Sequence, residues 1–217
     1  MKHRLSTPYR PPPPETLETV HVDADFVIAN KPSGLLSVPG IGPEKAVCAN
    51  SILSDRHGPV LTVHRLDMDT SGVMVFARTK DAQRAISRQF ERRKVGKTYE
   101  ALVEGVMAAE AGTIDAPIAK YSLKRPLRHL DPEGQTAITH WRVLDRGADQ
   151  TRVCLKPETG RSHQLRLHLA SLGHAILGDV FYGNPDNYAR LCLHAKTLEF
   201  DHPREARCVA FETPTPF

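Results

Sequence analysis

The stretch Val63-His64-Arg65-Leu66-Asp67-Met68-Asp69-Thr70-Ser71-Gly72 carries the most information about the fold of this chain. Apolar residues precede it at 60–63 and a continuous apolar run follows at 73–77, which is typical of two buried strands. A polar turn between buried strands is where a rigid scaffold presents reactive groups. The same residues also suit an ordinary hairpin turn, because Asp, Ser, Thr and Gly satisfy turn chemistry. Spacing alone leaves both interpretations open.

The composition indicates a globular protein. The chain has 217 residues, 40% of them hydrophobic and 25% charged, which suits one large domain or two small ones. The formal net charge of +4 permits an anionic partner without requiring one. No apolar run approaches the roughly 20 residues of a membrane helix, and the basic start lacks the apolar core of a signal peptide. We therefore expect a cytoplasmic protein that does not bind membranes.

Hydrophobic patterning predicts many strands and few helices. The expected strands are 25–30, 98–106, 135–144, 151–155, 191–200 and 207–211, and the expected helices are 44–57, 81–94 and one that ends at Gly173. Residues 107–135 contain several prolines and glycines and are expected to be loops. The pattern favours an α+β fold with a mixed, mainly antiparallel sheet flanked by helices and loops. Residues 1–18 are expected to form a proline-rich extended arm before a single domain at 19–217.

Two groups of basic residues could contact phosphates. The helix at 81–94 places arginines at near-helical spacing on one face, and a second group lies in the loop region at 120–128. A run of charge is also the ordinary composition of a solvated helix face. The sequence leaves both roles open.

Several common chemistries find little support. The four cysteines form no Cys-x-x-Cys pair, so buried free thiols are expected. The gaps between His163, His168 and His174 do not suit metal ligation from one helix face. Neither the Gly-x-Ser-x-Gly elbow of hydrolases nor a glycine-rich phosphate loop is present. These patterns favour neither a histidine metal site nor a redox or nucleotide cofactor.

One carboxylate interpretation is a phosphatase. Asp67-Met68-Asp69-Thr70 resembles the Asp-x-Asp-x-Thr motif of haloacid-dehalogenase-type phosphatases, which use a nucleophilic aspartate and magnesium. That family places the motif after a strongly apolar strand, whereas His64-Arg65 interrupts the apolar residues here. Its downstream acidic pair is matched only by Asp179. These departures make the phosphatase the weaker alternative.

The second interpretation rests on a series of motifs. His64-Arg65-Leu66-Asp67 followed by Thr70-Ser71-Gly72-Val73 resembles the signature of the RluA family of pseudouridine synthases. Further stretches resemble other motifs of that family in the same order: Asn30-Lys31-Pro32-Ser33-Gly34-Leu35, Lys97-Thr98-Tyr99, Gly160-Arg161-Ser162-His163-Gln164-Leu165-Arg166, Ile176-Leu177-Gly178-Asp179 with Tyr182-Gly183, and Leu191-Cys192-Leu193-His194-Ala195. The resemblance covers residues 20 to about 203.

This resemblance implies the pseudouridine synthase fold and an isomerisation of specific uridines in structured RNA, without metal or cofactor. The implied substrates are stem-loops of 23S-type ribosomal RNA and/or transfer RNA. The resemblance implies that Asp67 is the catalytic carboxylate, acting as nucleophile or base on the ribose beside C1′. Arg161 would oppose the rise in pKa that burial causes in a carboxyl group. Tyr99 would stack on the base and help to remove the C5 proton.

The resemblance also implies residues that hold the RNA. Arg65 would fill the stack that the extruded base vacates, and Leu193 would form an apolar wall. His64, His163 and Gln164 are further substrate-binding candidates. The candidates for contact with the RNA backbone are Arg84, Arg88, Arg92, Lys124 and Arg125.

Only about 18 residues precede the matching motifs, so we expect a compact, monomeric member without an additional N-terminal RNA-binding module. The alternative function is a non-catalytic RNA-binding protein of the same fold. The presence of Asp67, Tyr99 and Arg161 together favours the enzyme.

Overall fold

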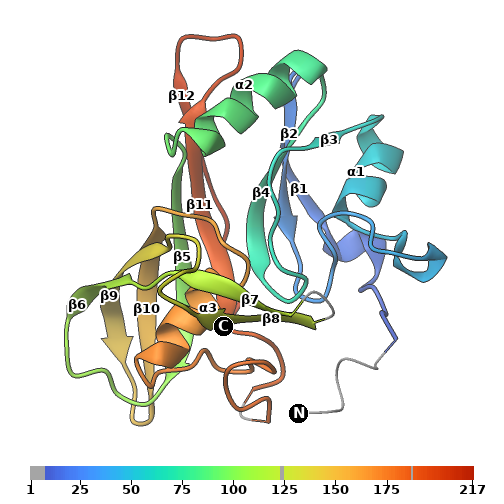
Figure 1. The fold of residues 1–217 in the computed structure, drawn as a ribbon. Helices are drawn as coiled ribbons and strands as arrows, with labels where there is room; N and C mark the ends of the chain where they lie inside the picture. The colour runs from blue at the N-terminus through green and yellow to red at the C-terminus, as the bar shows by residue number, and fades with distance from the viewer. Residues whose placement is uncertain (1–7, 123–124, 187) are drawn as a thin grey trace. The chain divides into compact units, whose positions relative to one another are not determined.

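The computed structural model describes residues 8–122, 125–186 and 188–217, and the chain forms two compact units (Figure 1). The N-terminal unit runs to Lys97 and also includes Ala195–Pro216. The central unit consists of Thr98–His194 with Phe217. The sequence analysis expects one domain from residue 19, whereas the chain groups into these two units. The α+β class with mainly antiparallel strands is confirmed.

The N-terminal unit is built on the strand that the sequence analysis places at 73–77. Its strands are β1 (Glu18–Val22), β2 (Phe26–Lys31), β3 (Leu61–Thr62), β4 (Ser71–Ala77), β11 (Leu193–Asp201, whose first two residues belong to the central unit) and β12 (Cys208–Glu212). The order is β1-β2-β4-β11, with β12 on β11 and β3 on β4. Every residue of β4 is buried, so the continuous apolar run forms an interior strand.

Helices of the N-terminal unit begin at recognisable caps. They are the short 3-10 helices η1 (Pro14–Thr16) and η2 (Pro43–Lys45), and the α-helices α1 (Ala49–His57) and α2 (Lys80–Glu91). The Thr79 hydroxyl accepts a hydrogen bond from the Ala82 N–H at 3.1 Å and caps α2, which contacts β3 and β4. Helix α1 starts later than predicted, because Cys48 caps it. It ends at Gly58 as predicted.

The proline-rich arm differs from the expectation from Tyr9 onward. Leu17 is only 1% exposed and belongs to the core. The Tyr9 hydroxyl donates to the Val47 carbonyl at 3.0 Å and accepts from the Leu36 N–H at 3.1 Å. Isolated apolar and aromatic residues in such a segment show no periodicity, so only tertiary contact reveals their place.

The central unit contains the remaining strands and one α-helix. Its elements are β5 (Gly96–Glu104, whose first two residues belong to the N-terminal unit), β6 (Ala111–Asp115), β7 (Ile118–Ser122), β8 (Arg125–Leu130), β9 (Ile138–Arg146), β10 (Gln150–Pro157) and α3 (Gln164–Ser171). The strands are ordered β5-β10-β9-β6, and β7 pairs with β8 as a separate hairpin. Helix α3 inserts Leu165 and Leu169 into an apolar cluster with Val153 and Leu155.

The expectation that residues 107–135 are loops is wrong, because β6, β7 and β8 lie there. Strand β6 pairs with β9 from Ala111↔Arg142 to Asp115↔Ile138. A Cβ atom at Gly112 would lie 2.9 Å from the Trp141 ring, so this glycine makes room for an aromatic side chain on the neighbouring strand. The glycine that suggested a loop therefore serves strand packing.

Among the described residues, none of the helices has the length and apolar character needed to cross a lipid bilayer.

Candidate active site

The Asp67 loop, residues 63–70, connects β3 to β4 in the N-terminal unit. Leu66 is buried, whereas Arg65 is exposed and Asp67 is half-buried. The Ser37 hydroxyl donates to the Leu66 carbonyl at 2.7 Å and accepts from the Leu66 N–H at 3.1 Å. Both backbone polar groups of Leu66 are therefore held by one side chain. The exposed Arg65 and the half-buried Asp67 lie on either side of this anchor.

The buried side chain of Lys31 binds the backbone of the Asp67 loop. Its side chain is 0% exposed, and Nζ donates to the carbonyls of Pro32 at 3.0 Å, Leu35 at 2.8 Å and Met68 at 2.9 Å. The Gly34 N–H also donates to the Met68 carbonyl at 3.0 Å. A buried ammonium group is tolerated when its donors are satisfied in this way. The motif at 30–35 thus supports the loop, a role that the sequence analysis did not assign to Lys31.

His64 supports the same loop from the other side. Its Nε2 atom accepts a hydrogen bond from the Val75 N–H at 3.1 Å, and its ring stacks on Phe90 with centroids 4.7 Å apart. Burial, together with the charge of Lys97, lowers the pKa of His64 to about 4. The ring is therefore neutral at pH 7 and ties the loop to β4 and α2. Direct contact between His64 and substrate stays a prediction.

Gly72, the second residue of β4, adopts a conformation that favours glycine. Its φ angle is 118°, and a Cβ atom there would lie 2.2 Å from the Ala195 carbonyl oxygen. The glycine therefore lets the start of β4 pass close to the backbone of β11.

In the central unit, Gln164 fixes the turn that carries Arg161. The side-chain Oε1 of Gln164 accepts from the Arg161 N–H at 3.0 Å and from the Thr159 hydroxyl at 2.8 Å. Its Nε2 donates to the Ile138 carbonyl and the Thr139 hydroxyl, both at 3.0 Å. The buried side-chain amide of Gln164 thus makes four hydrogen bonds within the protein. Gln164 thus positions Arg161, and substrate contact by Gln164 itself stays a prediction.

His163 lies between Arg161 and the start of α3. Its φ of 59° is in the left-handed region, which is unusual for a residue other than glycine. Its Nδ1 lies 2.9 Å from the Tyr182 hydroxyl, and its ring stacks on Phe181. The Tyr182 hydroxyl also accepts from the Arg128 N–H at 2.9 Å. One tyrosine therefore links the His163 turn to strand β8.

A buried ion pair joins the motif at 160–166 to the motif at 176–183. Arg166 Nε and Nη2 donate to the two carboxylate oxygens of Asp179 at 2.7 and 2.6 Å, and both side chains are at most 2% exposed. The same carboxylate accepts from the Phe181 and Tyr182 N–H groups. Burial alone would raise the pKa of Asp179, but the bonds and charge of Arg166 outweigh it and hold the pKa below its usual value.

The other predicted catalytic and apolar residues also lie in the central unit. Tyr99 is half-buried on β5, opposite Leu155 of β10, and packs against the apolar cluster. Leu193 is buried in the same cluster. The central unit thus contains Tyr99, Arg161 and Leu193, and the N-terminal unit contains Asp67 and Arg65.

The predicted RNA-backbone residues lie on two elements. Arg84 and Arg88 are exposed on α2 and Arg92 is exposed just after it, which fits the expected basic face. Arg84 lies 3.0 Å from Asp81 one turn earlier. Arg125 is the first residue of β8, and Lys124 lies outside the described residues.

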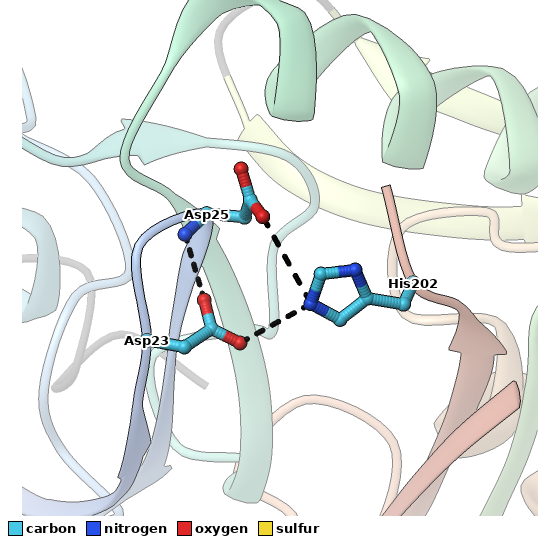
Figure 2. Close-up of side chains that lie close together, drawn as sticks. All are labelled: Asp23, Asp25 and His202. Carbon is cyan, nitrogen blue, oxygen red and sulfur yellow. Dashed lines mark hydrogen bonds and ion pairs between the residues drawn. The ribbon is translucent and has the colours of Figure 1, made fainter. Parts of the chain in front are cut away.

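Among the residues that the structure describes, Asp23, Asp25 and His202 form the one group with potential metal ligands close together, within 4.8 Å (Figure 2). His202 Nε2 lies 3.4 Å from Asp23 Oδ2 and 3.9 Å from Asp25 Oδ2. The Arg204 and Glu205 N–H groups donate to His202 Nδ1. Since Nδ1 accepts these bonds, Nε2 of the neutral ring carries the proton and faces the carboxylates as a donor.

Arg204 occupies the same group, because its Nε donates to Asp25 Oδ2 at 2.6 Å. The Asp23 carboxylate also accepts from the Asp25 and Phe26 N–H groups at 2.7 and 2.8 Å. Burial raises the pKa of Asp23, but these backbone bonds outweigh it and lower the pKa below its usual value. The group is a hydrogen-bonded cluster in which the Asp23 carboxylate, Asp25 Oδ2 and both ring nitrogens of His202 already have partners.

Comparison with known proteins adds independent evidence. Residues 25–171 match the family described as RNA pseudouridylate synthase. The chain is 45% identical over 214 residues to the dual-specificity RNA pseudouridine synthase RluA of Pasteurella multocida (strain Pm70), covering 96% of this chain and 98% of the relative. It is 42% identical to the protein of that name from Escherichia coli (strain K12), with the same coverage.

A solved structure of human RNA pseudouridylate synthase domain containing 1 is similar as well, with a TM-score of 0.81 and 31% identity. The similarity covers 96% of this chain and 87% of the human one. The family match includes the Asp67 loop and the Arg161 turn, and the relatives are similar along almost the whole chain. The chain belongs to the RNA pseudouridylate synthase family.

Proposed function

We propose that this protein converts specific uridines of structured RNA to pseudouridine, with Asp67 as the catalytic carboxylate. The observation that carries the proposal is the match over residues 25–171, which contains Asp67, Tyr99 and Arg161. The buried Lys31 and Ser37 contacts support it, because they hold the Asp67 loop in one conformation.

The proposed reaction is an isomerisation that needs no other reactant. Asp67 acts on the ribose beside C1′, and the bond between C1′ and N1 of the uracil breaks. The base turns, C5 bonds to C1′, the C5 proton leaves and N1 gains a proton. Tyr99 stacks on the base and helps to remove the C5 proton. Arg161 supplies a permanent positive charge that favours the ionised carboxylate of Asp67.

The proposed substrates are stem-loops of 23S-type ribosomal RNA and/or transfer RNA. The name of the two relatives, dual-specificity RNA pseudouridine synthase, supports more than one RNA substrate. The target base must leave its stack, which costs a few kcal/mol. The exposed Arg65 fills the vacated place with its planar guanidinium. We propose that the protein acts as a monomer in the cytoplasm.

The test is release of label from C5 of uridine in unmodified transcripts of both RNA classes, with excess EDTA present. We expect wild type to release label and Asp67→Asn and Asp67→Ala to release none, while both variants bind RNA within a few-fold of wild type. Release at the normal rate by either variant would refute the role of Asp67. Binding without release by wild type would favour a non-catalytic RNA-binding protein. Activity toward a phosphate ester that EDTA abolishes would favour the phosphatase.

A further inference from the structure

A cavity of about 370 Å³ lies in the central unit beside Arg161. Strand β7 contributes Ile118 and Lys120 to its wall, strand β8 contributes Arg128, and the following turn contributes Gln135. The volume lies within the range of about 300–1,000 Å³ that is typical of small-molecule sites. A lone phosphate would fill only a small part of it.

Backbone contacts hold the walls of this cavity in place. Ile118 and Gln135 exchange two backbone hydrogen bonds, both of 2.9 Å. A Cβ atom at Gly134 would lie 2.6 Å from the Ile118 carbonyl carbon, so glycine permits this close approach. Arg161 Nε donates to the Thr136 carbonyl at 3.1 Å. A site that is already formed loses less entropy on binding than one that must order its walls.

The lining favours an anionic ligand that also has an apolar part. Lys120, Arg128 and Arg161 provide three cationic side chains, and Glu133 provides one carboxylate. Arginine and lysine suit phosphate oxygens, and the half-buried Ala119 in the wall offers a small apolar surface to a base or a ribose. A nucleotide within an RNA strand combines these two properties.

We propose that this cavity binds one nucleotide of the RNA substrate other than the target uridine, with its phosphate held by Lys120 and Arg128. The proposal rests on the proposed function, since Arg161 both lines the cavity and belongs to the proposed catalytic set. A nucleotide held in this cavity fixes the register of the RNA strand on the protein. Lys120 and Arg128 are therefore residues that position the RNA, not catalytic ones.

The experiment compares wild type with Lys120→Gln/Arg128→Gln in binding to a fluorescent RNA stem-loop at several salt concentrations. We expect the double variant to bind roughly 10-fold more weakly and the slope of log K against log salt to fall by about 1 for each lost phosphate contact. The matched control is Lys156→Gln/Arg142→Gln, which removes two exposed cations of the same unit outside the cavity. This control should keep wild-type affinity. A circular dichroism melt of each variant checks folding.

A second arm locates the nucleotide. Single phosphates near the target uridine are replaced by neutral methylphosphonates, one position at a time. At one position, the methylphosphonate should weaken RNA binding by wild type but not by the Lys120→Gln/Arg128→Gln variant. Equal losses at every position, or a double variant with unchanged affinity and salt slope, would overturn the proposal.

Label release from C5 is measured on the same proteins and separates the two proposals. If wild type releases label and the double variant binds normally, the cavity proposal fails and the proposed function stands. If wild type releases none but the double variant binds more weakly at the mapped phosphate, the proposed function fails and the cavity proposal stands.

Discussion

Lys31 shows how a charged residue of a functional motif can serve structure. Its ammonium group contacts three backbone carbonyls and is 0% exposed, so its charge is used within the protein. The Met68 carbonyl belongs to the residue next to Asp67, which makes Lys31 a positioning residue for the proposed catalytic carboxylate.

Replacing Lys31 by methionine should lower both stability and activity. Methionine keeps much of the volume but leaves the buried Leu35 carbonyl without this donor, and a buried unpaired group costs about 1–3 kcal/mol. We expect the melting temperature to fall by roughly 5–10 °C, since about 1 kcal/mol corresponds to a few degrees at this chain length. The rate of label release should fall by more than the loss of folded protein accounts for.

The control for this prediction is Lys45→Met, which changes a lysine of the same unit whose side chain is 43% exposed. It should leave the melting temperature and label release unchanged. An equal effect of the two substitutions would show that the buried contacts of Lys31 contribute nothing specific.

At the scale of elements, the Arg166–Asp179 pair joins α3 to the segment that follows it in the central unit. Removing one partner of such a buried pair leaves an uncompensated charge and typically costs about 3–5 kcal/mol. Asp179→Asn should therefore lower the urea midpoint of unfolding markedly at pH 7.

The same pair predicts a dependence on pH. The pKa of Asp179 is lowered in the folded protein, so the pair stabilises the fold fully above the unfolded pKa of about 3.9. As pH falls below about 4, the unfolded carboxyl binds a proton before the folded one does, and this stabilisation is lost. The difference in urea midpoint between wild type and Asp179→Asn should shrink as pH falls from 5 to 3. A constant difference would contradict the assignment.

The elements that the sequence predicts well are those with strong periodicity or a clear cap. The buried run at 73–77 and the amphipathic helix near 81–94 are present, with ends shifted by up to three residues. The sequence does not predict strands β6 to β8, because they are short and show no clear alternation of apolar and polar residues. Strand β6 is stabilised by pairing with the distant β9, and β7 and β8 by pairing with each other.

The sequence likewise predicts only part of the candidate site. The motifs identified the Asp67 loop and the Arg161 turn, but not the contacts that hold them. Gln164 reads as a substrate residue in the sequence, and only the structure gives its amide four partners within the central unit. The motif indicates that Gln164 belongs to the site, and its burial and hydrogen bonds show that it holds the Arg161 turn.

At the scale of the whole molecule, the distribution of charge matters more than the net charge of +4. The exposed arginines 84, 88 and 92 on and after α2 either bind phosphates or form a solvated face. If they bind RNA, Arg84→Gln/Arg88→Gln/Arg92→Gln should reduce the slope of log K against log salt by about 2–3. Arg142→Gln should leave that slope unchanged. An unchanged slope in the triple variant would identify the α2 arginines as a solvated face.

The buried ammonium of Lys31 also bears on protein design. The conformation of the Asp67 loop depends on residues outside it, because the Met68 and Leu66 backbone groups bind the side chains of Lys31 and Ser37. Grafting residues 63–72 onto another scaffold would strip those partners away. A graft should therefore include the 31–37 segment as well as the loop. A graft of the loop alone would lack the side chains that hold its backbone.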